Sequence, residues 1–218
     1  MARRHGTGTL DHSSLALSPD SPAPGVVQAK AAMRAWIRAQ RATRSLQERR
    51  AAAVGLAAVV LELPEVQAAK CVCLYVSMPS EPGTTPLRTA LANAGIRVLL
   101  PVVLGGGQMD WALDAGELRP VRGLGGAEPT GPRLGRAAIR TADVVLVPAL
   151  AIDTLGHRLG QGAGYYDRAL PLLAPNVPVI AIVHDREVLD AAVQPIPVEP
   201  HDRRVDAVVT PVRYLRIG

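Results

Sequence analysis

After an unpatterned start, apolar residues at helical spacings dominate the first third of the chain. Residues 1–25 are rich in Gly, Ser, Thr, Pro and His and show no apolar periodicity, which predicts a disordered leader. Residues 26–44 carry Val, Met and Ile at helical spacings among Arg and Ala. Ser45 and Glu48 have the spacing of a capping box, so we expect a second helix over residues 46–63.

Beyond residue 70 the pattern changes to short, continuous apolar runs of strand length. These runs occupy residues 71–76, 96–100, 143–147, 179–183 and 207–210, with a shorter candidate strand at 109–113. We expect one helix to begin at Thr84 or Thr85 and end at Gly95, and another to cover residues 165–173. Pro101 is expected to end the second run. Continuous runs that alternate with helices indicate a largely parallel sheet covered on both faces.

The expected fold is an α/β, three-layer Rossmann-like sandwich with a largely parallel central sheet flanked by helices. The length of 218 residues suits a single domain, which we place over residues 26–218. Residues 105–136 are rich in Gly and Pro and are expected to form a long loop. The chain is 48% apolar and 20% charged, which excludes a mostly disordered protein. Because it contains no Phe, its core must be built from Ala, Val, Leu and Ile.

Composition also limits location and partners. The longest apolar run, residues 51–61, is far shorter than the roughly 20 residues that a bilayer requires, so no membrane span is expected. Cys71 and Cys73 lie two apart in an expected strand and share a face, which favours buried thiols in a reducing cytoplasm over a disulfide. The formal net charge of +5 is compatible with anionic partners, but does not distinguish a nucleotide, a nucleic acid and a membrane surface.

The most informative segment is RLGQGAGYYDRAL at residues 158–170. Its three alternate glycines let backbone N–H groups approach an anion closely, and Arg158 adds a guanidinium for phosphate oxygens. The spacing matches neither a Walker loop nor the G-x-G-x-x-G fingerprint, and a flexible turn is the alternative interpretation. An Asp beside a phosphate loop repels the ligand unless a cation such as Mg²⁺ bridges them. Asp167 is therefore either a metal residue or an ordinary acid in the first turn of a helix.

This segment resembles the signature of the 5-formyltetrahydrofolate cyclo-ligase family, also called methenyltetrahydrofolate synthetases. Four further segments resemble the family in order and kind: KAAMR at 30–34, YVSMPSEPGT at 75–84, VPALAID at 147–153 and EPHDRRVDAVVT at 199–210. The resemblance covers about residues 26–212. It implies an ATP- and Mg²⁺-dependent conversion of 5-formyltetrahydrofolate to 5,10-methenyltetrahydrofolate, with release of ADP and phosphate.

The resemblance also implies a mechanism and partners. The formyl oxygen attacks the γ-phosphorus of ATP, and N10 of the folate then attacks the imidate phosphate and expels phosphate. This chemistry needs a phosphate cradle, a cation and a slot for the pterin, but no protein nucleophile. The implied partners are ATP and a reduced folate, with no nucleic acid and no membrane, in a cytoplasmic monomer or weak homodimer.

Residue roles follow from the resemblance position by position. Catalytic roles fall to Arg158 and Tyr165. The implied ATP site consists of Lys30, Arg34, Arg158, Leu159, Gly160, Gln161, Gly162, Ala163, Gly164, Tyr165 and Tyr166. The implied folate site consists of Val76, Glu81, Gln161, Gly162, Ala163, Gly164 and Tyr165. The implied Mg²⁺ residues are Asp167 and Asp202.

The chain departs from the family pattern at three positions. Ala163 stands where many relatives have Lys, Gln161 replaces a common Arg or aromatic residue, and Ile152 stands where Phe is usual. Two other functions remain open at this point. One is a noncatalytic relative that binds a nucleotide or RNA, and the other is an ATP-dependent enzyme acting on another small metabolite.

Overall fold

The computed structural model describes residues 24–121, 126–199 and 202–217. The predicted leader over residues 1–25 falls almost wholly outside these ranges. The helices are α1 (Pro24–Ala42), α2 (Leu46–Leu61), α3 (Pro64–Gln67), α4 (Thr85–Asn93) and α5 (Tyr165–Ala169). Short 3₁₀ turns are η1 (Gly105–Gly107), η2 (Arg136–Thr141), η3 (Leu170–Leu172) and η4 (Asp185–Glu187). The strands are β1 (Cys71–Cys73), β2 (Arg97–Val103), β3 (Met109–Leu113), β4 (Leu118–Pro120), β5 (Ala127–Pro129), β6 (Val144–Pro148), β7 (Ala151–Asp153), β8 (Arg158–Leu159), β9 (Val179–Ile182), β10 (Val188–Leu189), β11 (Ala207–Val209) and β12 (Tyr214–Arg216).

A seven-stranded sheet in the order β12-β11-β9-β6-β1-β2-β3 forms the centre of the molecule. The five inner strands, from β11 to β2, pair in parallel. The two edge strands, β12 and β3, pair antiparallel. Two small sheets, β10-β7-β8 and β4-β5, lie outside it. The predicted largely parallel central sheet is therefore confirmed.

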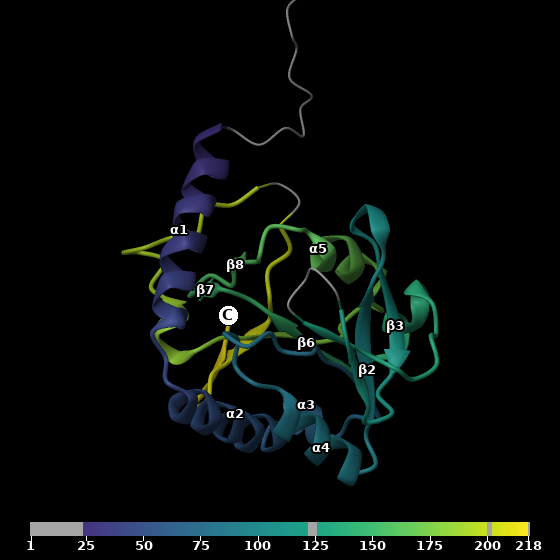
Figure 1. Cartoon of the computed structure of the whole chain (residues 1–218). Coiled ribbons are helices and arrows are strands. Elements are labelled where there is room, and N and C mark those ends of the chain that lie inside the picture. The colour runs from purple at the N-terminus through teal and green to yellow at the C-terminus, as the bar shows by residue number, and fades with distance from the viewer. Residues whose placement is uncertain (1–23, 122–125, 200–201, 218) are drawn as a thin grey trace, which may run out of the picture.

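Each inner strand buries both of its faces. In β1 and its continuation, Val72 and Leu74 join the cluster that contains α2 and α4 side chains, whereas Cys71 and Cys73 join the cluster under η2 and α5. Figure 1 shows α2, α3 and α4 on one side of the sheet and α5 on the other. Because both faces are covered, the strands read as continuous apolar runs. The three layers are confirmed, and so are the buried, unpaired thiols.

The capping box between α1 and α2 is confirmed at atomic detail. The Glu48 amide donates to the Ser45 hydroxyl at 3.2 Å, and the Ser45 amide donates to the Glu48 carboxylate at 2.7 Å. The other expected cap is different. Thr84 precedes α4 without a side-chain capping bond, because its hydroxyl donates to the Tyr75 carbonyl at 2.9 Å. Thr84 thereby holds the loop after β1, which leads into the site.

The prediction that Pro101 ends its strand is wrong. Strand β2 runs through Pro101, which pairs with Trp111 of β3. The last bond from the β1 side is donated by the Leu74 amide to the Leu99 carbonyl at 2.9 Å. The backbone N–H and C=O groups of alternate residues point toward the same neighbouring strand, so the Pro101 nitrogen also points toward the β1 side. No further N–H donor is required there, so the missing N–H of proline is tolerated.

Three other boundaries differ from the expectation. The strand at residues 71–76 ends at Cys73, and the helix expected over 165–173 becomes five α-helical residues followed by η3, which contains Pro171. The candidate strand at 109–113 is confirmed as β3. The rest of residues 105–136 is not one loop, because it contains η1 and the β4–β5 hairpin, whose three-residue strands are too short to show a period.

A buried ion pair fastens α1 to the rest of the fold. Arg41 is fully buried, and its Nε and Nη2 atoms donate to the two Glu187 carboxylate oxygens at 2.8 and 2.7 Å. The Arg41 Nη2 atom also donates to the Ala149 carbonyl at 2.7 Å. The same carboxylate accepts the His184 amide at 2.8 Å. Burial lowers the pKa of the His184 imidazole to about 4, so this ring is neutral at pH 7.

Candidate active site

A cavity of about 380 Å³ opens at the carboxyl edge of the parallel strands. Its walls come from the loop after β1, the end of β6, the glycine loop (residues 160–164), helix α1 and the segment around Glu199. Open α/β sheets bind ligands at this edge because loops from neighbouring strands converge there. The cavity is lined by every residue to which the resemblance assigns a role, from Lys30 to Asp202.

The glycine loop presents backbone N–H groups without protein partners. Gly162 and Gly164 have φ angles of +106° and +66°, which L side chains rarely adopt. Within the described part of the chain, none of the N–H groups of residues 160–164 donates a hydrogen bond. Successive unpaired amides in a turn form a concavity that binds anions. The loop is therefore suited to phosphate oxygens.

Two arginines of α1 donate hydrogen bonds to carbonyl groups of the glycine loop. Arg34 Nε donates to the Gly160 carbonyl at 2.9 Å, and Arg38 Nη2 donates to the Gln161 carbonyl at 3.0 Å. In a trans peptide, the N–H of the next residue points opposite to the carbonyl. Holding these carbonyls on the α1 side therefore directs the following N–H groups away from α1. Arg34 lines the cavity, whereas Arg38 lies outside its lining.

Arg158 and Tyr166 carry buried polar atoms without partners in the described residues. Arg158 donates through Nη2 to an Asp167 carboxylate oxygen, and its guanidinium carbon lies 5.7 Å from the Tyr166 ring centroid. The Arg158 Nε atom and the Tyr166 hydroxyl are both buried and unpaired. An unsatisfied buried polar group costs about 1–3 kcal/mol, so a ligand oxygen or water at these atoms would be stabilising. Burial also raises the pKa of the Tyr166 hydroxyl, which keeps it protonated.

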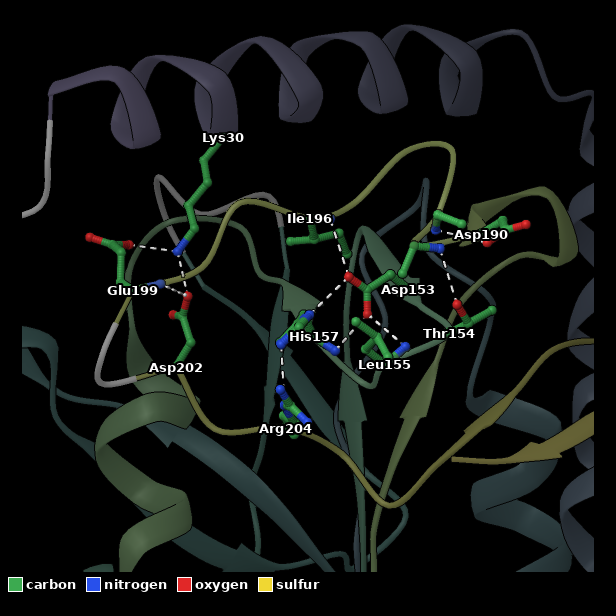
Figure 2. A network of polar contacts seen from close by, with 12 residues as sticks. Lys30, Asp153, Thr154, Leu155, His157, Asp190, Ile196, Glu199, Asp202 and Arg204 are labelled. Carbon is green, nitrogen blue, oxygen red and sulfur yellow. Dashed lines mark hydrogen bonds and ion pairs between the residues drawn. The ribbon is translucent and has the colours of Figure 1, made fainter. Parts of the chain in front are cut away.

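Lys30 reaches the cavity but its ammonium group is already bonded to carboxylates. Its Nζ lies 2.6 Å from Glu199 and 2.6 Å from Asp202, and the Glu199 amide donates to Asp202 at 2.8 Å. Figure 2 shows Lys30 descending from α1 onto both acids. The predicted phosphate contact of Lys30 would require it to share or exchange these bonds. Glu199 was not singled out from the sequence.

Glu81 also lines the cavity and contacts the glycine loop through Gln161. It is 5% exposed, and burial raises the pKa of its carboxyl above the ordinary value. One carboxylate oxygen accepts the Met78 amide at 2.9 Å, and the other accepts the Gln161 side-chain amide at 3.4 Å. The Gln161 oxygen accepts from Arg38 at 2.9 Å, which fixes the orientation of that amide. Val76 lines the same cavity.

A second polar network shapes the turn that leads into Arg158. Asp153 is fully buried and accepts the His157 amide and ring Nδ1, both at 2.9 Å, and the Ile196 amide at 3.2 Å. Arg204 contacts the other His157 ring nitrogen at 3.1 Å, as Figure 2 shows. The network joins the β7–β8 turn to the C-terminal segment and so supports the strand that carries Arg158.

Sequence reasoning missed part of the lining and three supporting residues. Arg38 and Arg168 bind the glycine loop from outside the cavity, and Glu199 binds Lys30. Residues 126–128 of the cavity wall belong to the segment that was expected to be a loop. The one available signal was the position of Arg168, directly after the glycine loop and its tyrosines.

The donor set is compatible with Mg²⁺. One carboxylate oxygen of Asp167 is bonded to Arg158, and one of Asp202 is bonded to Lys30. The second oxygen of each aspartate has no hydrogen bond to a described residue. Residues 24–121, 126–199 and 202–217 contain no group of three or more His, Cys, Asp or Glu that could hold a metal. Mg²⁺ is usually bound by one or two carboxylates together with phosphate oxygens and water, so two aspartates that line the same cavity suit it.

The fold and the cavity define an α/β protein with a glycine loop of unpaired amides at the carboxyl edge of its sheet. Residues 26–211 match the sequence model of the 5-formyltetrahydrofolate cyclo-ligase family. The chain belongs to this family.

Individual relatives agree with that membership. The chain is 45% identical over 149 residues to the 5-formyltetrahydrofolate cyclo-ligase of Mycolicibacterium smegmatis, covering 66% of this chain and 75% of that protein. It is 31% identical over 163 residues to the Escherichia coli K12 enzyme, covering 70% and 84%. The NMR structure of the Aquifex aeolicus 5,10-methenyltetrahydrofolate synthetase superposes with a TM-score of 0.72 at 28% identity, covering 86% of this chain and 92% of that one. Among the described helices, none has the length and apolarity needed to cross a membrane.

Proposed function

We propose that the protein converts 5-formyltetrahydrofolate to 5,10-methenyltetrahydrofolate with ATP and Mg²⁺, releasing ADP and phosphate. The observation that carries the proposal is that Arg158, the glycine loop and Glu81 all line one cavity. The first two supply donors for an anion, and Glu81 supplies a buried acceptor. The family membership and the names of the relatives support the same reaction.

The two parts of the cavity suit the two substrates. We assign the phosphates to the glycine loop, Arg158, Arg34 and Lys30, where unpaired N–H groups and cations gather. We assign the pterin to Glu81 and Val76, because a carboxylate accepts the adjacent N–H donors of an amino-pyrimidinone edge. Gln161, which belongs to the glycine loop and is bonded to Glu81, joins the two groups of residues.

The proposed reaction requires the two substrates to meet in line. The formyl oxygen attacks the γ-phosphorus and ADP leaves, which forms an imidate phosphate. N10 of the folate then attacks the activated formyl carbon and closes the five-membered ring. The N10 proton passes to the departing phosphate. The residues of the cavity orient both substrates and stabilise charge on the transferred phosphoryl group, chiefly through Arg158 and the loop amides. We assign Tyr165, which lines the cavity directly after the glycine loop, a place beside the transferred group.

We assign Mg²⁺ to Asp167 and Asp202, directly or through water. When bound, the ion neutralises part of the charge on the phosphate oxygens. We also infer a cytoplasmic location, supported by the unpaired Cys71 and Cys73 thiols. ATP and a reduced folate are the only partners that the proposal requires.

Direct assay of the methenyl product tests the proposal. With ATP, Mg²⁺ and 5-formyltetrahydrofolate, absorbance of 5,10-methenyltetrahydrofolate should rise, and ADP and phosphate should form in equal amounts. Omitting ATP, or removing Mg²⁺ with EDTA, should abolish the signal, and added Mg²⁺ should restore it. ATP hydrolysis without methenyl product would contradict the proposed substrate, and product formation without ATP would contradict the mechanism.

Glu81→Gln should separate the two substrates. An amide presents one acceptor oxygen and turns a donor toward the donors of the pterin, and an unpaired buried donor costs about 1–3 kcal/mol, or roughly 5- to 150-fold in affinity. We expect the affinity for the reduced folate to fall by that factor while the ATP affinity stays within about 2-fold. Titration calorimetry with each ligand separately measures both. Glu128→Gln is the matched control, because Glu128 lines the same cavity and is paired with Arg119. Equal losses for ATP and folate would place Glu81 outside the pterin slot.

A further inference from the structure

Arg168 joins three segments around the glycine loop from outside the cavity. Its Nε donates to the Gly107 carbonyl at 2.8 Å, and its Nη2 donates to the Ala163 carbonyl at 2.5 Å. Its guanidinium carbon lies 6.0 Å from the Tyr165 ring centroid. Arg168 therefore connects the turn after β2 with the glycine loop and with the start of α5.

Glycines make room for this guanidinium on two sides. A Cβ atom built on Gly107 would lie 2.2 Å from the Arg168 Nη2 atom, and one built on Gly164 would lie 3.0 Å from Nη1. Both residues have positive φ angles, +72° and +66°. A side chain at Gly107 would thus displace the guanidinium from the carbonyl that it binds. The glycine of the η1 turn and the arginine of α5 fit as a pair, although they lie 61 positions apart.

The Ala163 carbonyl is the feature of the loop that Arg168 controls. Among the described residues, Arg168 is the one whose side chain donates a hydrogen bond to this carbonyl. Because the peptide is planar and trans, holding the Ala163 carbonyl toward Arg168 directs the Gly164 N–H to the opposite side. Arg34 and Arg38 hold the Gly160 and Gln161 carbonyls in the same way. Ala163 itself offers no charged side chain to a phosphate, so its contribution must come from the backbone.

We propose that Arg168 is a positioning residue that keeps the glycine loop in its phosphate-binding geometry by tying Ala163 to Gly107. The proposal rests on the proposed function of the loop as the ATP phosphate site. Arg168 does not line the cavity, so it acts through the backbone of the loop. Its loss should therefore weaken ATP binding more than folate binding.

Two neighbouring glycines provide a matched test in the full-length protein. Gly106 and Gly107 have nearly equal φ angles of +69° and +72°, but a Cβ on Gly106 meets no atom within 4 Å. Gly106→Ala and Gly107→Ala therefore both place a Cβ atom at a positive φ, and only Gly107→Ala also displaces Arg168. The readouts are the ATP affinity by titration calorimetry in the presence of Mg²⁺, and KM for ATP and for 5-formyltetrahydrofolate. Thermal melts identify variants that have lost their fold.

We expect Gly107→Ala and Arg168→Gln each to weaken ATP binding and raise KM for ATP by about 10-fold, which is the size of one coupled contact. KM for the folate should stay within 2-fold of the wild-type value. Gly106→Ala should remain within 2-fold of wild type. The Gly107→Ala/Arg168→Gln double variant should be no worse than either single variant. Arg168→Lys should restore part of the affinity, because one ammonium group reaches one carbonyl rather than two.

Equal effects of Gly106→Ala and Gly107→Ala on ATP affinity would overturn the proposal, as would additive losses in the double variant. Equal rises in KM for both substrates would also overturn it, because they indicate general damage to the cavity. Calorimetry keeps this test separate from the proposed function. If the wild-type protein forms no methenyl product but Gly107→Ala still loses ATP affinity and Gly106→Ala does not, the positioning role stands and the proposed reaction fails.

Discussion

Arg158→Ala should lower kcat/KM for ATP by about 10- to 150-fold, the equivalent of a charge-assisted hydrogen bond of roughly 1.5–3 kcal/mol. Arg158 lines the cavity beside the glycine loop, and its Nε atom is buried without a partner in the described residues. A phosphate oxygen at this atom would satisfy it. Arg158→Lys should recover little of the loss, because an ammonium group lacks the two-pronged geometry of a guanidinium.

Loss of Arg158 should leave the fold intact. Its partner Asp167 keeps a side chain that is 27% exposed, so water can solvate the carboxylate when the guanidinium is removed. Steady-state kinetics beside a thermal melt make the measurement, with Arg140→Ala as the control for loss of an exposed arginine outside the cavity. Unchanged kinetics, or a loss that follows a collapse of the melting temperature, would count against a role in ATP use.

Arg41→Met should destabilise the protein by about 3–5 kcal/mol, because it leaves the Glu187 carboxylate buried without its charged partner. Glu187 is 6% exposed and accepts both Arg41 nitrogens at 2.7–2.8 Å. For a domain of this size, about 2–4 °C of melting temperature per kcal/mol gives a decrease of roughly 6–20 °C. Chemical denaturation gives the free energy of unfolding, and a thermal scan gives the midpoint.

Two controls separate buried charge from lost packing. Adding Glu187→Gln to Arg41→Met removes the unpaired charge and should recover a large part of the lost stability. Arg216→Met breaks the ion pair with Glu65, but Arg216 has a side chain that is 74% exposed, so the free energy of unfolding should hardly change. A similar cost for Arg41→Met and Arg216→Met would show that the Arg41–Glu187 pair contributes no more than a surface pair.

Sequence pattern was sufficient where the cause of a structure is local. The apolar runs at 143–147 and 179–183, and the first half of the run at 71–76, were correctly assigned to buried parallel strands, because a strand covered on both faces must be apolar throughout. The Ser45–Glu48 capping box was correct because both partners lie within one helical turn. Pro101 was misjudged, because whether a proline ends a strand depends on which neighbour its missing N–H would face.

The site divides in the same way. The sequence by itself determined the glycine loop, Arg158 and Asp167, since the positive φ angles and the adjacent charges are properties of one short segment. Only the tertiary structure decided what surrounds that loop. Arg34 and Arg38 of α1 bind the loop from more than 120 positions away in the sequence. Arg168 connects the loop to Gly107, which lies in a segment that the sequence pattern predicts only as loop. Such contacts join segments whose pairing depends on the packing of the whole sheet and its helices, and no local period or spacing records that packing.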